Sequence, residues 1–358
     1  MFKKINLGLI GAGRVAGHHL KALKNNKSFN VKCICDLNIS KAKEYSKKYK
    51  LACYNHYKEM LDNEPSLDLV AIITPSGMHY EHSKYILKNY NVSLVVEKPT
   101  FLKSSQVVEI YKLAKKFNKK IYPVFQNRYN KAVKRLKKAM EKNELGLGRI
   151  ISVRVRWCRP QRYYDLSDWR GTFSHDGGAL TNQGIHHIDL IRYLFGNVKN
   201  LQANMKTMGV KIEVEDTVIA NLNFENNSLG VLEITTAARP KDYEASISIV
   251  GEKGLAQLGG LAVNELQIFT PKPKDCKIFS EKIPDAYGFG HYHLYKDIAL
   301  DMKRIKKFPV SANDCLGTIK LLNAFYVSTE KKKSVMLKNI KDSKRLGEKN
   351  EKISKKYR

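Results

Sequence analysis

The sequence lacks the features that would assign it to the membrane, secreted or repeat proteins. Its 358 residues contain no unbroken apolar run of the roughly 18 residues that a membrane-spanning helix requires. The chain enters its first expected strand almost at once, so we expect no signal peptide, and it shows neither an internal repeat nor a low-complexity linker. A hydrophobic content of 43% then predicts a soluble, globular, cytoplasmic protein without membrane attachment, long enough for two domains.

Cysteine is sparse and unpatterned. The six cysteines form no C-x-x-C pair and follow no regular spacing, so we expect reduced, buried thiols rather than a disulfide framework. Zinc is the competing chemistry for the histidines near position 186. That segment offers neither a His-Glu-x-x-His arrangement nor a convincing third ligand. The sequence therefore predicts no metal site.

Acidic residues are few: 34 Asp and Glu stand against 64 Lys and Arg, which leaves a net charge of +30. An excess of this size suggests nucleic-acid binding. The lysines are spread along predicted helix faces, however, and no recognisable nucleic-acid module is present. We expect solvated surface lysines and no nucleic-acid partner, with long-range attraction of an acidic partner as the alternative.

What the sequence does contain is a glycine turn near its start. A short apolar run ends in Gly11-x-Gly13-x-x-Ala16, and a helical pattern follows. The first glycine makes the turn, the second lets the backbone approach a pyrophosphate, and the small alanine lets helix and strand pack closely. Asp36 ends the next predicted strand, where a carboxylate binds the adenine ribose hydroxyls and repels a 2′-phosphate. The pattern predicts NAD in preference to NADP; the alternative is a strand–turn–helix with an unrelated surface aspartate.

The pattern of elements changes once along the chain. Strands and helices alternate through residues 1–125, which predicts an α/β Rossmann domain with a doubly wound parallel sheet. Residues 126–337 show short strands joined by tight turns and interrupted by helices, which predicts an α+β domain with a mostly antiparallel sheet. Residues 338–358 are mostly charged, and we expect this C-terminal tail to fray.

Glu97-Lys98-Pro99 directly follows a predicted buried strand, at the sheet edge where ligands bind. A buried lysine is costly without a role, and the proline directs Lys98 into extended geometry. Such an ammonium can hydrogen-bond a substrate hydroxyl and stabilise developing alkoxide charge during hydride transfer. The alternative is a structural pair between Glu97 and Lys98.

A second candidate group follows a pair of glycines. On one helix, Asn182, His186 and Asp189 would share a face. A neutral imidazole can accept a hydroxyl proton as hydride leaves the same carbon. Because two adjacent histidines are not expected to point into one cleft, we choose His186 over His187.

Four motifs occur in order along the chain: Gly11-x-Gly13-x-x-Ala16, Thr74-Pro75 with His79, Glu97-Lys98-Pro99, and Gly177-Gly178 running to Gly184-x-His186-x-x-Asp189. Together they resemble the Gfo/Idh/MocA oxidoreductase family. The resemblance implies a Rossmann domain joined to an open-faced sheet domain, and hydride transfer between NAD(P) and a sugar or polyol carbon. It also implies a homo-oligomer, dimer or tetramer, built through the open sheet face.

A finer resemblance is carried by five further motifs: Phe125-Gln126-Asn127-Arg128-Tyr129-Asn130, Arg159-Pro160-Gln161-x-Tyr163-Tyr164-Asp165, Trp169-Arg170-Gly171-Thr172, Asn182-Gln183 and Gly288-x-Gly290-His291-x-x-x-Tyr295-x-Asp297. They look like the WlbA-type subgroup, which oxidises UDP-N-acetylglucosaminuronate at C3 in bacterial surface-polysaccharide pathways such as that of lipopolysaccharide. One departure from the wider family is Asn182, at a position usually held by Asp. An amide does not raise the pKa of His186 as a carboxylate would, so the division of acid and base work between Lys98 and His186 stays open.

A nucleotide sugar acid carries two phosphates and a carboxylate, which guanidinium groups bind in bidentate fashion. Of the arginines between residues 126 and 170, Arg128 and Arg159 are flanked by motif residues, and we choose them. Tyr163 or Tyr164 is expected to contact sugar or uracil. For each arginine the alternative is a charge on a strand surface.

These motifs and the resemblance assign the following candidate residues. For catalysis they are Lys98, His186 and Asn182. For cofactor binding they are Gly11, Gly13, Arg14, Val15, Asp36, Thr74, Pro75, His79, Glu97, Lys98, Gln126, Trp169 and Arg170. For substrate binding they are Lys98, Arg128, Arg159, Tyr163, Tyr164, Asn182, Gln183 and His186.

We therefore expect an NAD-dependent dehydrogenase that converts the C3 hydroxyl of UDP-N-acetyl-2-amino-2-deoxyglucuronate into a ketone. Two alternatives stay open. One is a dehydrogenase of the same family that acts on a free polyol, inositol or another nucleotide sugar. The other is a non-catalytic NAD-binding regulator, because one fold supports several functions.

Overall fold

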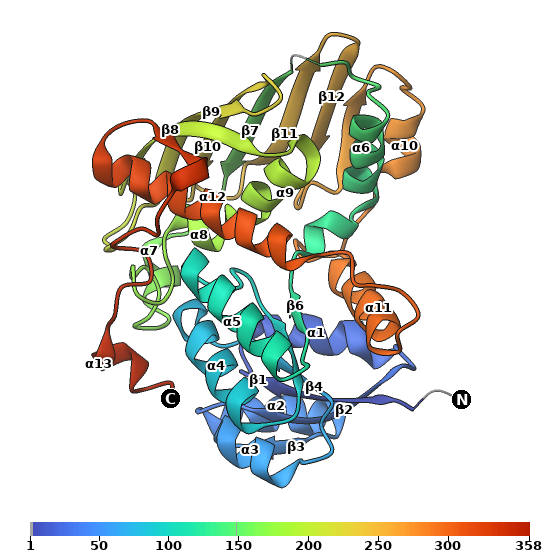
Figure 1. Cartoon of the computed structure of the whole chain (residues 1–358), viewed down its shortest axis with the longest axis vertical. Coiled ribbons are helices and arrows are strands. Elements are labelled where there is room, and N and C mark those ends of the chain that lie inside the picture. Colours follow the sequence, from blue (N-terminus) through green and yellow to red (C-terminus); the bar gives the residue numbers. More distant parts are fainter. Residues whose placement is uncertain (1–2, 148) are drawn as a thin grey trace.

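A computed structural model describes residues 3–147 and 149–358; residues 1, 2 and 148 lie outside the described part. Figure 1 shows two regions stacked along the long axis, with a parallel sheet and its helices below and a larger sheet above. Helix α12 (Ala312–Lys331) crosses between them. Within the described ranges, no helix is long and apolar enough to cross a membrane.

The N-terminal region is a doubly wound α/β unit, which confirms the predicted Rossmann domain. Six parallel strands lie in the order β3-β2-β1-β4-β5-β6, and the reversal of strand order between β1 and β4 is where such sheets bind ligands. Strand β4 is buried along its whole length, as expected of a strand covered on both faces. The elements are β1 (Ile5–Ile10), α1 (Arg14–Lys24), β2 (Phe29–Cys35), α2 (Ile39–Tyr49), β3 (Ala52–Tyr54), α3 (Tyr57–Asn63), β4 (Leu69–Ile72), η1 (Ser76–Met78), α4 (His79–Asn89), β5 (Ser93–Val96), α5 (Ser104–Lys116) and β6 (Ile121–Pro123).

The second region contains an eight-stranded sheet in the order β13-β12-β11-β7-β10-β9-β8-β14. Strands β7 and β10 pair in parallel and their neighbours pair antiparallel, which confirms the mostly antiparallel α+β prediction. The elements are η2 (Gln126–Tyr129), α6 (Lys131–Glu141), β7 (Ile150–Arg156), α7 (Gln161–Tyr164), α8 (Ala179–Asn182), α9 (Ile185–Phe195), β8 (Val198–Lys206), β9 (Thr217–Phe224), β10 (Leu229–Thr235), β11 (Glu244–Gly251), β12 (Gly254–Gly259), β13 (Glu265–Phe269), α10 (Asp275–Phe279), α11 (Gly290–Met302), β14 (Val335–Met336), η3 (Leu337–Asn339) and α13 (Glu351–Ser354).

This large sheet is open on one face. Buried and exposed residues alternate along β9, because helices cover one face of the sheet and leave the other uncovered. The outer face carries exposed apolar side chains from several strands, namely Ile150, Ile219, Leu229, Val231, Val250, Leu255 and Ile268. An apolar face of this kind is typical of a protein–protein contact.

Two expectations about local structure are wrong. The segment expected to be one helix is two, because α8 ends at Asn182 and α9 begins at Ile185 with Gly184 as its N-cap. A side chain at Gly184 would meet Ile234 at 2.5 Å, so the glycine lets this corner pack against β10. Asn182 and His186 therefore come from different helices.

The tail does not fray. Leu346 is fully buried, the Gly347 amide donates to the Phe173 carbonyl at 2.7 Å, and Asp342 accepts from the Ser104 amide at 2.7 Å. The last contact satisfies an otherwise free N–H at the start of α5, which a charged but solvated tail would not do. High charge predicted disorder here, but specific pairing orders the segment.

Candidate active site

One cavity of about 870 Å³ lies between the two regions, at the carboxyl ends of the parallel strands. Residues that follow β1, β2, β4 and β5 meet residues of the second region in its wall. Of the predicted site residues, the wall contains Gly11, Gly13, Arg14, Val15, Asp36, Thr74, Pro75, His79, Glu97, Lys98, Gln126, Arg159, Tyr163, Trp169, Arg170, Asn182, Gln183 and His186. Residues distant in the sequence are thus brought to one site.

The glycine turn has the geometry that a pyrophosphate requires. Gly11 has a φ of +103°, and a side chain there would lie 2.6 Å from the Ile73 carbonyl, so only glycine fits. At Gly13, by contrast, an added Cβ would meet no described heavy atom within 4 Å. Gly13 is also the N-cap of α1 and supplies no side-chain cap, which leaves the first helical N–H groups open to an anion. The turn therefore fits a dinucleotide phosphate.

Asp36 is held rigidly beside this turn. Its Oδ2 accepts from the Ala12 amide at 2.7 Å, and its Oδ1 accepts from the Asn38 amide at 2.8 Å. The carboxylate is thus fixed at the end of β2, in the cavity wall. This arrangement suits ribose hydroxyls, and the negative charge disfavours a 2′-phosphate.

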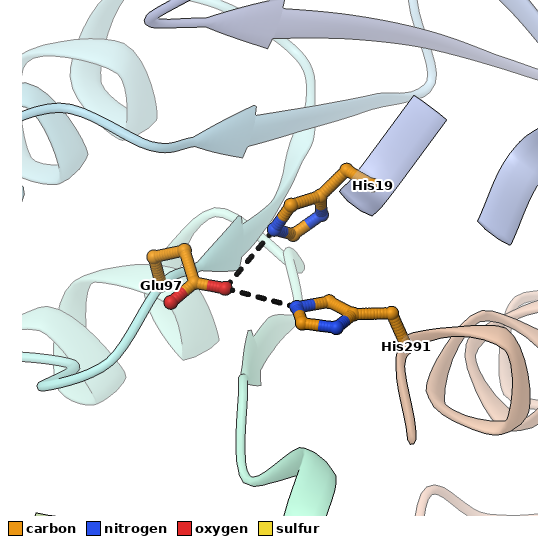
Figure 2. A group of neighbouring side chains, drawn as sticks. All are labelled: His19, Glu97 and His291. Carbon is orange, nitrogen blue, oxygen red and sulfur yellow. Dashed lines mark hydrogen bonds and ion pairs between the residues drawn. The ribbon is translucent and has the colours of Figure 1, made fainter. Parts of the chain in front are cut away.

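Figure 2 shows that Glu97 is clamped by two histidines. Its Oε1 accepts from His19 Nε2 at 3.0 Å and from His291 Nε2 at 3.2 Å. Its Oε2 accepts from the Lys98 backbone amide at 2.9 Å. Burial acts to raise the pKa of Glu97, but the two histidine hydrogen bonds hold the pKa well below its usual value. Glu97 is thus a fixed anion that orients the start of the Lys98 segment.

The same three side chains carry the types of ligand atom that bind metals, and these atoms lie within 4.8 Å of one another. In this geometry the two Nε2 atoms each donate to Glu97 Oε1, and the Tyr295 hydroxyl lies 2.7 Å from His19 Nδ1. If His19 donates from Nε2, its Nδ1 accepts from Tyr295. With both histidines protonated on Nε2, the three side chains form a hydrogen-bond network centred on Glu97 Oε1.

Among the described residues, the Lys98 ammonium forms no ion pair with the Glu97 carboxylate, which binds Lys98 only at its backbone amide. The ammonium donates to the Asn182 backbone carbonyl at 2.9 Å, across the cavity wall. Burial lowers the pKa of Lys98, while the charges of Glu97 and Asp176 oppose that shift. An ammonium has three N–H donors, so this contact leaves donors for a ligand oxygen.

Asp176 is a buried carboxyl that the sequence analysis did not assign to the site. Its Oδ1 accepts from the Asn182 side-chain amide at 2.5 Å, and its Oδ2 accepts from the Gly171 amide at 2.8 Å. Burial raises its pKa to about 6. Because the Asn182 amide nitrogen is engaged by Asp176, its amide oxygen remains to accept from a ligand. The signal was present in the sequence, since Asp176 directly precedes the paired glycines.

His186 and His187 both border the cavity, but His186 is 9% exposed and His187 0%, so His186 is the one reachable from the cleft. Burial, followed by the charge of Lys98, holds the pKa of His186 well below its usual value. Gln126 Nε2 lies 3.5 Å from His186 Nε2, and His186 Nδ1 has no partner among the described residues. Burial lowers the pKa of His187 to about 4. Both imidazoles are therefore neutral near pH 7.

Two predicted substrate residues lie outside the cavity wall. Arg128 is buried and forms a bidentate pair with Asp189, at 2.6 and 2.7 Å. Its remaining nitrogen contacts Asp314 at 3.4 Å. Tyr164 is also buried, with its hydroxyl 3.2 Å from that of Thr236. Both side chains are occupied by structural contacts, so the prediction that they bind substrate is corrected.

The other arginines expected at the site do line the cavity. Arg170 NH1 donates to the Tyr163 hydroxyl at 2.8 Å and its guanidinium stacks 4.6 Å from the Trp169 ring. Arg159 NH1 donates to Asp242 at 2.9 Å. Gln183 Nε2 lies 3.5 Å from the Tyr163 hydroxyl. Together they make a polar, cationic and aromatic wall opposite the glycine turn.

Sequence reasoning also missed an aromatic wall beside α1. His18 stacks on Tyr287 at 3.8 Å, and both line the cavity. Tyr57 and Tyr357 line it as well. Tyr287 immediately precedes the expected Gly288-x-Gly290 motif, which was the available signal. Tyr357, in the charged tail, had none.

Both regions of the chain match models of known protein families. Residues 5–125 match the family model described as the oxidoreductase family, NAD-binding Rossmann fold, and residues 133–257 match the GFO/IDH/MocA C-terminal domain.

Two solved structures resemble the whole chain. One is the WlbA dehydrogenase from Chromobacterium violaceum in complex with NADH and UDP-GlcNAcA, 33% identical over 94% of this chain and 96% of that one, with a TM-score of 0.86. The other is the WlbA dehydrogenase from Bordetella pertussis with the same two ligands, 30% identical over 93% and 98%, with a TM-score of 0.88. A curated relative, glucose-6-phosphate 3-dehydrogenase of Bacillus subtilis, is 27% identical over 69% of this chain and 72% of its own.

Proposed function

Because the chain belongs to the Gfo/Idh/MocA family of NAD-dependent oxidoreductases, we propose that it oxidises the C3 hydroxyl of UDP-N-acetyl-2-amino-2-deoxyglucuronate to a 3-keto sugar. One observation carries the proposal. An ammonium, an amide oxygen and a neutral imidazole, from Lys98, Asn182 and His186, border the same cavity as a glycine turn suited to a dinucleotide. Similarity to two WlbA dehydrogenases over more than nine-tenths of the chain supports the choice of substrate.

Lys98 acts on the reacting oxygen in this proposal. When bound, NAD supplies the nicotinamide ring that takes up the hydride. Lys98 donates to the C3 oxygen and stabilises the negative charge that develops there as the hydroxyl proton leaves for His186; hydride departure then converts this oxygen into the ketone oxygen. Its contact with the Asn182 carbonyl fixes the ammonium, so little reorganisation is needed during the reaction.

His186 accepts the hydroxyl proton. Its low pKa keeps the imidazole neutral at physiological pH, so a nitrogen lone pair is free for the proton. Asn182 orients the sugar through its amide oxygen, and the hydrogen bond to Asp176 holds the amide in that orientation. The pKa of Asp176, raised to about 6, leaves this carboxyl ionised above that pH.

The cofactor is held by residues of both domains in this proposal. Gly11 and Gly13 admit the pyrophosphate to the helix N-terminus, and Asp36 accepts from the adenine ribose. The remaining cofactor residues line the same cavity: Arg14, Val15, Thr74, Pro75, His79, Glu97, Gln126, Trp169 and Arg170.

The UDP-sugar is bound by the wall opposite the glycine turn. Arg159 supplies positive charge for the diphosphate or carboxylate, and Tyr163 and Gln183 supply polar contacts to the sugar or uracil. We further propose a place in surface-polysaccharide biosynthesis, and a homo-oligomer built through the open face of the large sheet. The apolar side chains on that face support the second point, and sedimentation of the protein in solution tests it.

The alternative is a family dehydrogenase of a free polyol, inositol or another nucleotide sugar. Similarity to a glucose-6-phosphate 3-dehydrogenase favours a family member that acts on a sugar without a uridine group. The cationic wall also suits a sugar phosphate, so the uridine moiety is the feature that distinguishes the substrates.

NADH formation over a panel of substrates tests the proposal. The panel contains the UDP-uronate, UDP-N-acetylglucosamine, glucose 6-phosphate and free inositol. We expect turnover of the UDP-uronate and calorimetric binding of UDP alone. Turnover of inositol or glucose 6-phosphate, with none of the UDP-uronate, would support the alternative.

A further inference from the structure

The last residues of the chain lie against the dinucleotide-binding domain. We call residues 351–358 the C-terminal strap; they comprise α13 and the segment after it. In Figure 1 the red chain descends from the upper region to α13, and the strap ends near α4 of the lower region. It is thus positioned to act on both regions at once.

The strap is bound to the Rossmann domain at three points. His56 Nε2 lies 2.7 Å from the Arg358 carbonyl, and His82 Nε2 lies 2.8 Å from the Tyr357 carbonyl. The Arg358 guanidinium also pairs with Glu81 at 2.7 Å. Two backbone carbonyls and one side chain are therefore held by α4 and the segment before α3.

The strap is also bound to the second region. Ser354, which is buried, has its hydroxyl 3.1 Å from His175 Nε2. Asp168 accepts from Lys356, and its other oxygen accepts from the Tyr357 hydroxyl at 3.2 Å. Asp168 directly precedes Trp169 and Arg170, which line the cavity. The strap thus connects the two walls of the cavity.

Tyr357 brings the strap into the cavity itself. It lines the same cavity as the glycine turn and Asp36. Burial raises the pKa of Tyr357 to about 12, and the charges of Asp168 and Asp36 add to the shift, which places the phenol within electrostatic reach of Asp36. The phenol is neutral at physiological pH and offers an aromatic surface at the ribose end of the cavity.

A hydrogen-bond chain links the strap to the sheet edge. The Tyr357 carbonyl requires a donor, so His82 carries its proton on Nε2. His82 Nδ1 then accepts from the Thr74 hydroxyl at 3.0 Å. Thr74 follows β4 and lines the cavity beside Gly11. Displacing the strap would free this donor and loosen the loop at the cavity edge.

We propose that the C-terminal strap is part of the NAD site: Tyr357 forms the wall of its adenosine end, and the strap's contacts to both regions retain the bound dinucleotide. The inference requires that the glycine turn and Asp36 hold NAD, but it does not depend on which sugar is oxidised. It would apply equally to a free-polyol dehydrogenase.

Calorimetric titration of the substrate-free protein with NAD tests the proposal, using Tyr357→Ala. The matched control is Lys355→Ala, an exposed strap residue that hydrogen-bonds to Glu351 through its backbone amide. We expect Tyr357→Ala to raise the Kd for NAD by roughly tenfold, and Lys355→Ala to change it by less than about twofold. Asp36→Ala serves as the reference for loss of a ribose contact.

Comparison of Tyr357→Ala with Asp36→Ala distinguishes failure of the strap proposal from failure of the proposed NAD site. If Asp36→Ala weakens NAD binding and Tyr357→Ala does not, the strap proposal is overturned while the proposed dehydrogenase stands. If neither variant changes the Kd, the placement of the adenosine end is wrong and the strap proposal falls with it. Melting curves of the NAD-free variants show whether a weakened variant is folded.

A measurement on the wild-type protein tests the same proposal without a variant that could fail to fold. Amide hydrogen exchange of residues 351–358 is followed with and without NAD. We expect exchange in the strap to slow on NAD binding, because bound ligand stabilises the closed arrangement. Unchanged exchange in the strap, with slowed exchange in the glycine turn, would overturn the proposal.

Discussion

At the residue scale, the proposed chemistry depends on a lysine held by its surroundings. Glu97 fixes the backbone of Lys98 from one side, and the Asn182 carbonyl binds its ammonium from the other. His19 and His291 in turn hold Glu97, so helices α1 and α11 contribute indirectly to the position of the ammonium. The site is therefore preorganised by contacts outside the cavity.

Replacing Lys98 by Met tests its role in the chemical step. We expect kcat to fall by about 10²–10⁴-fold, the range for loss of one general acid–base or charge-stabilising group. The Kd for NAD is expected to change little, because the pyrophosphate and ribose contacts lie elsewhere in the cavity. Steady-state kinetics and calorimetry measure the two quantities, and Lys112→Met, on the exposed face of α5, is the control.

A Lys98→Met enzyme that retained its kcat would contradict the assignment. One that lost NAD affinity in the same proportion would instead assign Lys98 to cofactor binding.

Asp176 predicts a pH dependence. Burial raises its pKa to about 6, so this carboxyl becomes protonated as the pH falls through about 6. Protonation removes the negative charge that favours the Lys98 ammonium and weakens the hold on the Asn182 amide. In the wild-type protein, kcat/KM is therefore expected to fall below that pH.

In Asp176→Asn the carboxylate is absent at every pH. We expect a lower kcat/KM near pH 8 and loss of the part of the acid limb centred near pH 6. An acid limb that keeps its midpoint and amplitude in the variant would show that another group, such as His186, is responsible.

At the element scale, much of the fold was predictable from periodicity and turns. The parallel strands of the first region and the mostly antiparallel strands of the second lie where the pattern of elements placed them. The break between α8 and α9 was not predictable. It depends on the close packing of Gly184 against Ile234, which lies in a strand about fifty residues later in the sequence. The strand β14 has only two residues, and its pairing with β8 is set by tertiary packing.

The part of the candidate site that was predictable consists of residues in motifs with a defined backbone geometry. The glycine turn, Lys98 and His186 follow strands and turns that the sequence displays. Arg128 could not be distinguished from Arg159, because both are arginines in motif-like segments. Only the folded chain brings Asp189 against Arg128, and only there does Tyr357 meet the cavity.

Substitution by alanine is expected to lower protein stability at Gly11 and NAD affinity at Gly13. Gly11→Ala is expected to lower the free energy of unfolding by about 3 kcal/mol, because the side chain would meet the Ile73 carbonyl at a φ of +103°. Gly13→Ala has open space and a φ of −73°, so the NAD-free protein should keep nearly its full stability. Its added methyl group would instead obstruct the approach of the pyrophosphate.

Urea denaturation and NAD titration of both variants measure these effects. Equal losses of stability in the two, or full NAD affinity in Gly13→Ala, would contradict the proposed use of the turn.

Arg128 and Arg159 are expected to have different roles, the first in protein stability and the second in substrate binding. Arg128→Met leaves Asp189 buried without its partner and is expected to cost about 3–5 kcal/mol of stability. Arg159→Met removes a partly exposed contact with Asp242, so we expect a loss within about 1 kcal/mol. Calorimetry with the UDP-sugar should show weaker binding only for Arg159→Met among those variants that fold.

A stable Arg128→Met protein with weakened UDP-sugar binding would reverse these two roles.

At the scale of the whole molecule, the cavity belongs to neither domain alone. The parallel sheet supplies the glycine turn, Asp36 and Lys98, while the second domain supplies His186 and the cationic wall. The strap adds a third connection between them.

The central claim is that hydride leaves C3 of a UDP-sugar acid for NAD. Incubating the protein with NAD and UDP-N-acetyl-2-amino-2-deoxyglucuronate deuterated at C3 tests it most directly, with mass spectrometry of the NADH formed. We expect NADH that carries one deuterium, together with a UDP-sugar product that has lost it. NADH without deuterium, or no NADH while a free sugar is oxidised under the same conditions, would contradict the account.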